Sequence, residues 1–250
     1  MYMWYWFNST RAARWLGQGG TSASEGVALP MSEERTQEPV HLPRIGDPAP
    51  GFEAPSSQGT IRLDDFKGKW VVLFSHPSDF TPVCTTEFVE FARRTPEFQD
   101  MGAQLVGLSV DSVYSHIAWI RNIEEKFGVD VTFPVIADLS TDVSRKYGMI
   151  HAGEADTATV RAVFLIDPEQ RIRALLYYPM SAGRAVSEIQ RLLQALQLNA
   201  AHGLATPQGW TPGEACIVPP PATQAEASDR LKRQDLELTD WYLARTPAPE

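Results

Sequence analysis

The chain has 250 residues, 43% of them hydrophobic, and a formal net charge of -9 from 31 acidic and 22 basic residues. A chain of this length can bury one large core, and its acidic balance argues against a nucleic-acid surface. Its two cysteines, Cys84 and Cys216, are too few for a disulfide framework or a four-cysteine metal site, so we expect a reducing, cytoplasmic compartment. It contains no apolar run of the roughly 18 residues that a membrane span needs, so we expect no membrane partner.

The first 38 residues differ in composition from the rest. Aromatic residues crowd Met1–Trp15, and glycine, serine and alanine follow. Arg11 and Arg14 give a faint likeness to a targeting peptide, but the basic start and the long aliphatic run of such peptides are missing. We interpret residues 1–38 as a disordered extension, or as a start placed too early, because Met31 begins an ordinary polar lead-in.

From Leu42 onward the signals become regular, and we predict one domain over residues 42–198. Alternating residues predict a short strand over Ile61–Asp65, and the continuous apolar run Trp70–Phe74 predicts a buried central strand. Residues 87–98 have the spacing of a helix, and the patterns that follow predict a strand over 104–110, a helix over 112–127 and a strand over 133–137. This βαβ order predicts parallel strands.

The later part of this domain is predicted to be a hairpin followed by a helix. Strands over 160–167 and 171–178 flank a turn at Pro168-Glu169-Gln170. A helix over 186–198 carries apolar residues at helical spacing and is expected to close one face of the sheet. The earlier 112–127 helix carries Ile117, Ile120 and Ile123 together.

After residue 198 the composition changes to proline-rich connections that end in Pro219-Pro220-Pro221. We expect a smaller unit over residues 199–250. Its sequence predicts a short helix over 224–233, and Trp241-Tyr242-Leu243 is interpreted as a strand or a docking segment.

The segment most informative about chemistry lies between a buried strand and a helix and reads Ser75-His76-Pro77-Ser78-Asp79-Phe80-Thr81-Pro82-Val83-Cys84-Thr85-Thr86-Glu87. Cys84 falls in the first turn of that helix, where unpaired backbone N–H groups and the helix dipole stabilise a thiolate. Thr81 stands where a thioredoxin-type motif has its first cysteine, and its hydroxyl can cap the helix and hold an oxygen substrate. Pro77 and Pro82 stiffen the loop. The pattern predicts a lone activated cysteine beside a hydrogen-bonding hydroxyl.

The pattern Pro77-x-x-x-Thr81-x-x-Cys84 resembles the peroxiredoxin signature, and the stretch around it resembles the 1-Cys branch, of the peroxiredoxin 6 type. Three further segments are similar to that branch, namely 157–164, 182–184 and 217–221. The resemblance extends from about Leu42 to Tyr242. It implies an α/β, thioredoxin-like fold, with a central mixed β-sheet flanked by helices. It also implies that residues 199–250 form a smaller C-terminal α+β extension of the dimerisation type.

The resemblance also implies a reaction and a set of site residues. Cys84 attacks the terminal oxygen of hydrogen peroxide or an organic hydroperoxide, becomes a sulfenic acid, and releases water or an alcohol. Arg161 stabilises the thiolate and the transition state, and Thr81 orients the peroxide. The supporting or substrate-binding residues are Pro77, His76 and Arg184. We expect no metal and no cofactor.

Cys216 is expected to be buried and passive. The resolving cysteines of archaeal relatives lie later, at places held here by Leu238 and Ala244. An external small-molecule or protein thiol must then reduce the sulfenic acid. A disulfide between Cys84 and Cys216 is the competing hypothesis. The resemblance further implies a homodimer or a larger ring. As aromatic residues, Trp210, Trp241 and Tyr242 are candidate contact residues, and packing within their own chain is the alternative for each.

Two other functions remain open at this point. The same cysteine would serve a peroxide sensor or holdase, and Cys84 with His76 would provide the minimal chemistry of a cysteine hydrolase. Phospholipase activity is not expected, because Lys67–Val71 holds no serine nucleophile where some relatives carry one. The other histidines have no spacing that indicates a metal site, and no role is predicted for His41, His116, His151 and His202.

Overall fold

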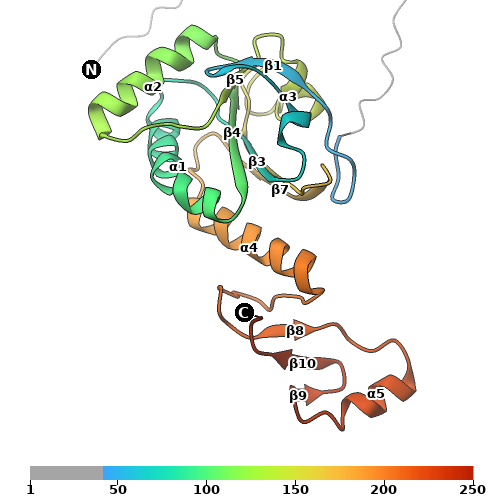
Figure 1. Cartoon of the computed structure of the whole chain (residues 1–250). Helices are drawn as coiled ribbons and strands as arrows, with labels where there is room; N and C mark the ends of the chain where they lie inside the picture. The colour runs from blue at the N-terminus through green and yellow to red at the C-terminus, as the bar shows by residue number, and fades with distance from the viewer. Residues whose placement is uncertain (1–41, 250) are drawn as a thin grey trace, which may run out of the picture. The chain divides into compact units, whose positions relative to one another are not determined.

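The computed structural model describes residues 42–249 and contains two β-sheets (Figure 1). The larger sheet has the strand order β2-β1-β5-β4-β3-β6-β7. Its strands are β1 (Glu53–Ser56), β2 (Gly59–Arg62), β3 (Trp70–Ser75), β4 (Ala103–Ser109), β5 (Val135–Ala137), β6 (Arg161–Ile166) and β7 (Ile172–Tyr178). The extension predicted over residues 1–38 lies outside the described residues.

This sheet is mixed. Strand β4 pairs in parallel with β3 and β5, whereas β6 runs antiparallel to β3 and β7. The parallel strands are those that the βαβ order predicts, and the β6–β7 pair is the hairpin predicted around residues 168–170. The predicted α/β, thioredoxin-like fold class is confirmed.

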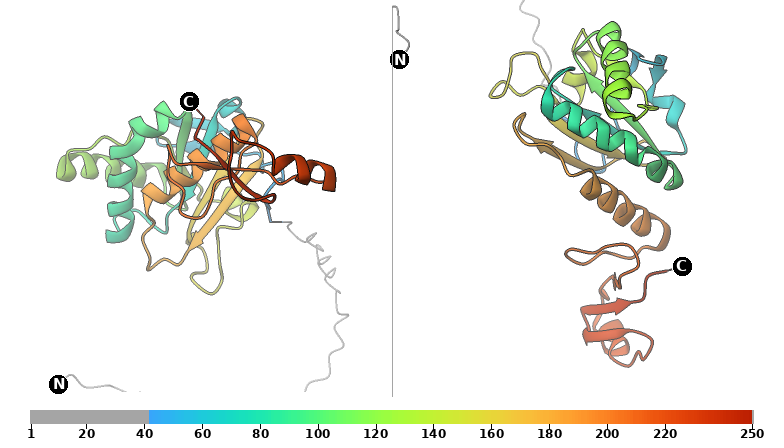
Figure 2. Two further views of the ribbon diagram at one scale, coloured as in Figure 1. Left: turned by 90° about the horizontal axis from the view of Figure 1, so that it is seen from below. Right: turned by 90° about the vertical axis from the view of Figure 1, so that its left-hand side faces the viewer.

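Strand β3 has an unbroken apolar sequence because both faces of the sheet are covered there. Its even-numbered residues pack in a core with α1 (Pro82–Asp100), α2 (Val113–Phe127) and α4 (Val186–His202). Its odd-numbered residues pack in a second core with residues of α3 (Asp142–Lys146) and of the 3-10 helix η1 (Leu63–Phe66). Helices α1 and α4 lie side by side (Figures 1 and 2). Within the described residues, no helix combines the length and the apolar character required to cross a bilayer.

One prediction about this domain is wrong in part, and the buried face of α2 has an unexpected composition. The strand expected over Ile61–Asp65 ends at Arg62, where the Asp65 carboxylate accepts the Arg62 backbone N–H and turns the chain into η1. On α2, Ile117 is 39% exposed. The residues that α2 buries are His116, Trp119 and Ile123.

The C-terminal residues form a second, three-stranded sheet in the order β8-β10-β9. Its elements are β8 (Cys216–Val218), α5 (Gln224–Arg230), β9 (Glu237–Asp240) and β10 (Leu243–Thr246). Trp241 and Tyr242 are exposed and form the turn between β9 and β10. Of the three residues interpreted as a strand or a docking segment, only Leu243 therefore lies in a strand. Trp210 is 2% exposed and packs with Cys216, so of its two alternatives the structure supports packing within its own chain.

Candidate active site

The loop over residues 76–81 joins β3 to α1 and places Cys84 in the first turn of that helix. Pro82 opens α1, a position that suits proline because its missing N–H would have no intrahelical partner. Thr81 is the N-cap residue, but its side chain makes no capping hydrogen bond. The Thr81 hydroxyl donates to the Ser78 carbonyl at 2.9 Å. The predicted capping role is therefore wrong, because this hydroxyl closes a turn within the loop.

Cys84 meets Arg161, the first residue of β6, in the protein interior. The two residues are 0% and 2% exposed, and Arg161 Nη1 lies 3.4 Å from Cys84 Sγ. Arg161 Nε and Nη2 donate to the Met180 carbonyl at 3.0 and 2.8 Å, which fixes the guanidinium. A permanent cation and a helix N-terminus beside the sulfur are the surroundings typical of a reactive cysteine.

Glu87 lies one turn after Cys84 on α1 and is 3% exposed. Its carboxylate accepts from Arg161 Nη1 at 2.8 Å, and from Arg184 Nε and Nη2 at 2.9 and 2.7 Å. Burial raises the pKa of Glu87, but the charge and hydrogen bonds of Arg184, together with the Arg161 charge, hold that pKa below its ordinary value. Glu87 is therefore ionised, and it fixes both arginines.

Arg184 connects this carboxylate to the sheet. Its Nη1 donates to the carbonyls of Ser75 and Ala162, both at 2.9 Å. These carbonyls belong to the end of β3 and the start of β6, so Arg184 ties together the two strands that bracket the site. The sequence singled out Arg184 and Arg161 but missed Glu87, whose one signal was its place at the end of the matching segment.

A second buried cluster joins the loop to α2. His76 Nε2 lies 2.9 Å from Asp79 Oδ1, and His116 Nδ1 lies 2.9 Å from Asp79 Oδ2. Among the described residues, this is the group of histidine and carboxylate side chains close enough to suggest a metal site. Tetrahedral zinc would hold its ligand atoms about 3.3 Å apart, whereas these atoms are already at hydrogen-bond distance. We therefore assign the cluster as a hydrogen-bonded network.

The remaining candidates lie in different surroundings. Pro77 is buried in the loop. His116 is 0% exposed and contacts Asp79 and the Ile136 carbonyl, so its ring nitrogens have partners within the protein. The structure leaves His151 and His202 exposed, and His41 lies outside the described residues.

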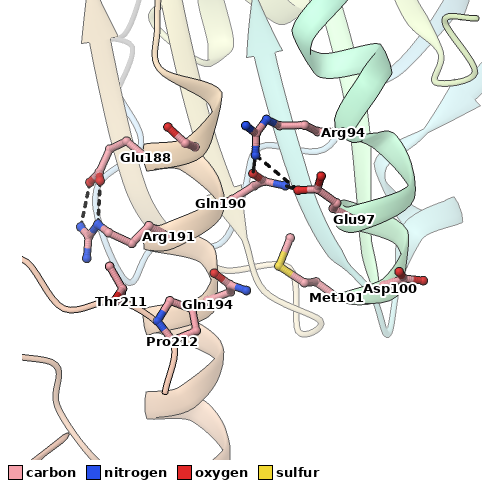
Figure 3. A pocket seen from close by; sticks show the side chains of 11 residues that line it. Arg94, Glu97, Asp100, Met101, Glu188, Gln190, Arg191, Gln194, Thr211 and Pro212 are labelled. Carbon is pink, nitrogen blue, oxygen red and sulfur yellow. Dashed lines mark hydrogen bonds and ion pairs between the residues drawn. The ribbon is translucent and has the colours of Figure 1, made fainter. Parts of the chain in front are cut away.

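A groove of about 630 Å³ lies between α1 and α4 and has none of the predicted site residues in its lining (Figure 3). Several of its charged side chains interact with neighbours in the groove. Arg94 donates to Gln190 at 2.8 Å, and Arg191 forms an ion pair with Glu188. We assign no ligand to this groove.

Comparison with known proteins identifies the family. The model of the AhpC/TSA family matches residues 45–175, and that of the C-terminal domain of 1-Cys peroxiredoxin matches residues 195–234. A peroxiredoxin of Aquifex aeolicus is 51% identical over 219 residues, which cover 83% of this chain and 98% of the relative. The chain belongs to the peroxiredoxin family.

Other relatives of this peroxiredoxin agree. A peroxiredoxin of Methanosarcina mazei is 51% identical over 211 residues, covering 81% of this chain and 96% of the relative. A yeast mitochondrial 1-Cys peroxiredoxin structure is 39% identical, with a TM-score of 0.73 and coverage of 82% of this chain and 100% of that one. A cysteine-to-serine mutant of peroxiredoxin 6 of Arenicola marina is 36% identical, with a TM-score of 0.75 and coverage of 83% and 99%.

This peroxiredoxin is a thiol-dependent peroxidase of the 1-Cys type, which reduces peroxide through a cysteine. The family and the reaction predicted from the sequence are confirmed.

Proposed function

We propose that Cys84 is the cysteine that reduces the peroxide, with Arg161 and Thr81 as its partners in catalysis. The observation that carries this assignment is the 3.4 Å contact between Cys84 Sγ and the Arg161 guanidinium, at the first turn of α1. The thiol of Cys216 donates to the Glu214 carbonyl at 3.7 Å, and Cys216 packs in a cluster with Trp210. Those surroundings suit a passive, buried cysteine.

The proposed reaction is a displacement at oxygen. The Cys84 thiolate attacks the terminal peroxide oxygen, and an S–O bond forms as the O–O bond breaks. The sulfur is oxidised to a sulfenic acid, and the leaving oxygen takes up a proton to become water or an alcohol. Arg161 is positioned to stabilise the charge that develops between sulfur and oxygen, and the Thr81 hydroxyl orients the peroxide.

The sulfenic acid is then reduced by an external thiol, and no other cofactor is required. In the yeast mitochondrial 1-Cys peroxiredoxin, thiol resolution runs via the glutathione and thioredoxin systems, and we propose a small-molecule or protein thiol of this kind here. Both hydrogen peroxide and organic hydroperoxides are proposed substrates. Both contain the O–O bond whose terminal oxygen the Cys84 thiolate attacks.

We also propose a cytoplasmic location and a homodimer or larger ring. The location is supported by two free cysteines, which suit a reducing compartment. The oligomer is supported by the exposed aromatic residues Trp241 and Tyr242. Light scattering coupled to size exclusion measures the mass of the assembly.

The cysteine hydrolase alternative lacks its central contact. Such an enzyme needs a histidine hydrogen-bonded to the nucleophile. His76 Nε2 instead lies against Asp79, and within the described part of the chain His76 Nδ1 has no hydrogen-bond partner. The Cys84 thiol is paired with Arg161, which cannot act as a base.

The assignment of Cys84 is tested by trapping the oxidised sulfur. Reduced protein is treated with about one equivalent of hydrogen peroxide in the presence of dimedone, and the peptides are analysed by mass spectrometry. We expect the dimedone adduct on Cys84, no peptide linking Cys84 to Cys216, and recovery of the free thiol with dithiothreitol when dimedone is omitted. An adduct confined to Cys216 would refute the assignment, and a linked peptide would replace the one-cysteine mechanism by a disulfide mechanism.

Arg161→Lys is expected to lower kcat/KM for hydrogen peroxide by about 100-fold, the scale of losing one transition-state donor. Lysine keeps the positive charge but cannot contact Met180, Glu87 and the sulfur together as the guanidinium does. The control is Arg173→Lys on β7, where a partly exposed arginine pairs with Asp167. Stopped-flow peroxide kinetics measure both variants, and an unchanged kcat/KM in Arg161→Lys contradicts the proposed role.

A further inference from the structure

Helix α2 contacts the segment that carries Cys84 on both sides of the cysteine. His116 Nδ1 lies 2.9 Å from Asp79 Oδ2, in the loop before Cys84. Trp119 Nε1 donates to Thr85 Oγ1 at 3.3 Å, immediately after Cys84. The two α2 residues are three positions apart and share its buried face. One helix therefore holds the loop and the start of α1 together.

Both ring nitrogens of His116 face oxygen atoms of other residues. Its Nε2 lies 3.1 Å from the Ile136 carbonyl, which can only accept, so Nε2 carries a hydrogen. Its Nδ1 faces both oxygens of Asp79, at 3.1 and 2.9 Å. Burial raises the pKa of Asp79, but the hydrogen bonds of His116 and His76 outweigh burial and hold that pKa far below its ordinary value. The ring of His116 is thereby held between the loop before Cys84 and β5.

His76 contacts the same carboxylate. Its Nε2 donates to Asp79 Oδ1 at 2.9 Å, and its buried Nδ1 has no hydrogen-bond partner among the described residues. Burial lowers the pKa of His76 more than Asp79 raises it, so the ring is neutral. It packs against Phe88 and Trp119, with ring centroids at 4.7 and 5.1 Å, and these two side chains share a core cluster with Cys84. A nitrogen with a free lone pair therefore lies within this buried region.

The other charged group close to this network is Asp111, which follows β4. Its carboxylate accepts the Asp79 backbone N–H at 3.0 Å and the Ser78 hydroxyl at 3.3 Å. The Asp111 charge favours a protonated His76, but burial outweighs it. Asp79 is thus held by the two histidines through its carboxylate and by Asp111 through its backbone N–H.

We propose that His116 is a positioning residue of the peroxidase site: through its contact with Asp79 it holds the loop before Cys84 and orients His76, whose Nδ1 has no hydrogen-bond partner among the described residues. The proposal rests on Cys84 being the nucleophile. Without the His116 side chain, the Asp79 carboxylate would lose one of the two histidines that hold it. The Asp79 carboxylate would then orient His76 and the loop less strictly.

The test reads the tautomer of His76 directly. The sequence has 5 histidines, so long-range proton–nitrogen spectra of the reduced, histidine-labelled full-length protein are simple enough to assign by substitution. Because the pKa of His76 is lowered by burial, we expect its ring to be neutral at about pH 7, above the ordinary histidine pKa of about 6.5, and to show the Nε2–H tautomer. An Nδ1–H tautomer of His76, or a doubly protonated His76 ring, would overturn the proposal.

Substitution connects this state to catalysis. His116→Gln is expected to lower kcat/KM for hydrogen peroxide by about 10- to 100-fold, the scale of a small misplacement of reacting groups, and to broaden or shift the His76 signals. The matched control is His151→Gln at an exposed position, which should change neither. A His116→Gln protein with wild-type kcat/KM and an unchanged His76 tautomer would refute the positioning role.

The histidine spectra also separate this proposal from the proposed function. Cys84→Ser protein should keep the histidine pattern while losing activity. If Cys84 is not the nucleophile, that variant stays active. If His116 is not the positioning residue, His116→Gln leaves kcat/KM and the His76 signals unchanged, whereas Cys84→Ser is still inactive.

Discussion

Cys84→Ser is expected to abolish peroxide consumption supported by dithiothreitol, by more than about 1,000-fold, whereas Cys216→Ser is expected to keep nearly the full rate. A serine hydroxyl does not ionise near neutral pH, and its oxygen cannot be oxidised to a sulfenic acid and returned by a thiol. The guanidinium of Arg161 would remain, but it would have no nucleophile to assist. The measurement is the rate of peroxide loss over many equivalents per chain, with the thermal unfolding temperature recorded for each protein.

The two cysteine variants are closely matched controls. Both thiols are fully buried, and both substitutions replace a sulfur by a smaller oxygen. In Cys216→Ser, the hydroxyl can still donate to the Glu214 carbonyl that the thiol faces. We therefore expect this substitution to lower the free energy of unfolding only slightly. Full activity in Cys84→Ser contradicts the assignment. If the wild-type protein consumes only about one equivalent of peroxide per chain, a sensor replaces the peroxidase in this chain.

The sequence predicts the fold and half of the site for identifiable reasons. The unbroken apolar run of β3 and the helix after it place Cys84 at a helix start without any tertiary information. Arg161 is 77 positions from Cys84 in the sequence, and no periodicity joins the two. The resemblance to a family brought Arg161 into the prediction, and the antiparallel pairing of β3 with β6 shows how the chain folds it back to the sulfur.

The residues that sequence reasoning missed are charged or polar groups buried by partners far along the chain. Glu87 is buried because two arginines compensate its charge, and its helix gives no local sign of this. On α2, the apolar spacing indicated Ile117, yet the buried face carries His116 instead. The hydrogen-bond partner of that histidine is Asp79, which is 37 positions away in the sequence. A hydrophobic pattern cannot identify a buried charge whose partner is set by tertiary structure.

Glu87→Gln is expected to lower the free energy of unfolding by about 3–5 kcal/mol, because it removes one partner from a buried ionic cluster. Arg161 and Arg184 would keep their charges with no carboxylate between them, at positions that are 3% and 0% exposed in their side chains. The amide oxygen of the substituted side chain can still accept hydrogen bonds. Its NH2 group, however, would face the N–H donors of Arg161 and Arg184. The matched control is Glu90→Gln on the same helix, where a half-exposed carboxylate pairs with Arg94. That substitution is expected to cost less than about 1 kcal/mol.

The pH dependence separates a charge effect from a packing effect. The pKa of Glu87 is lower in the folded protein than its ordinary value of 4.5, so its stabilising contribution is fully present above about pH 4.5. That contribution is lost as the pH falls through the lower, folded pKa, and the difference in stability between wild type and Glu87→Gln should narrow there. Denaturant unfolding of both proteins between about pH 7 and about pH 3.5 measures the difference. If the difference in free energy of unfolding stays constant over this pH range, Glu87 stabilises the protein through its shape and packing. The positions of the two arginines would then not depend on the Glu87 charge.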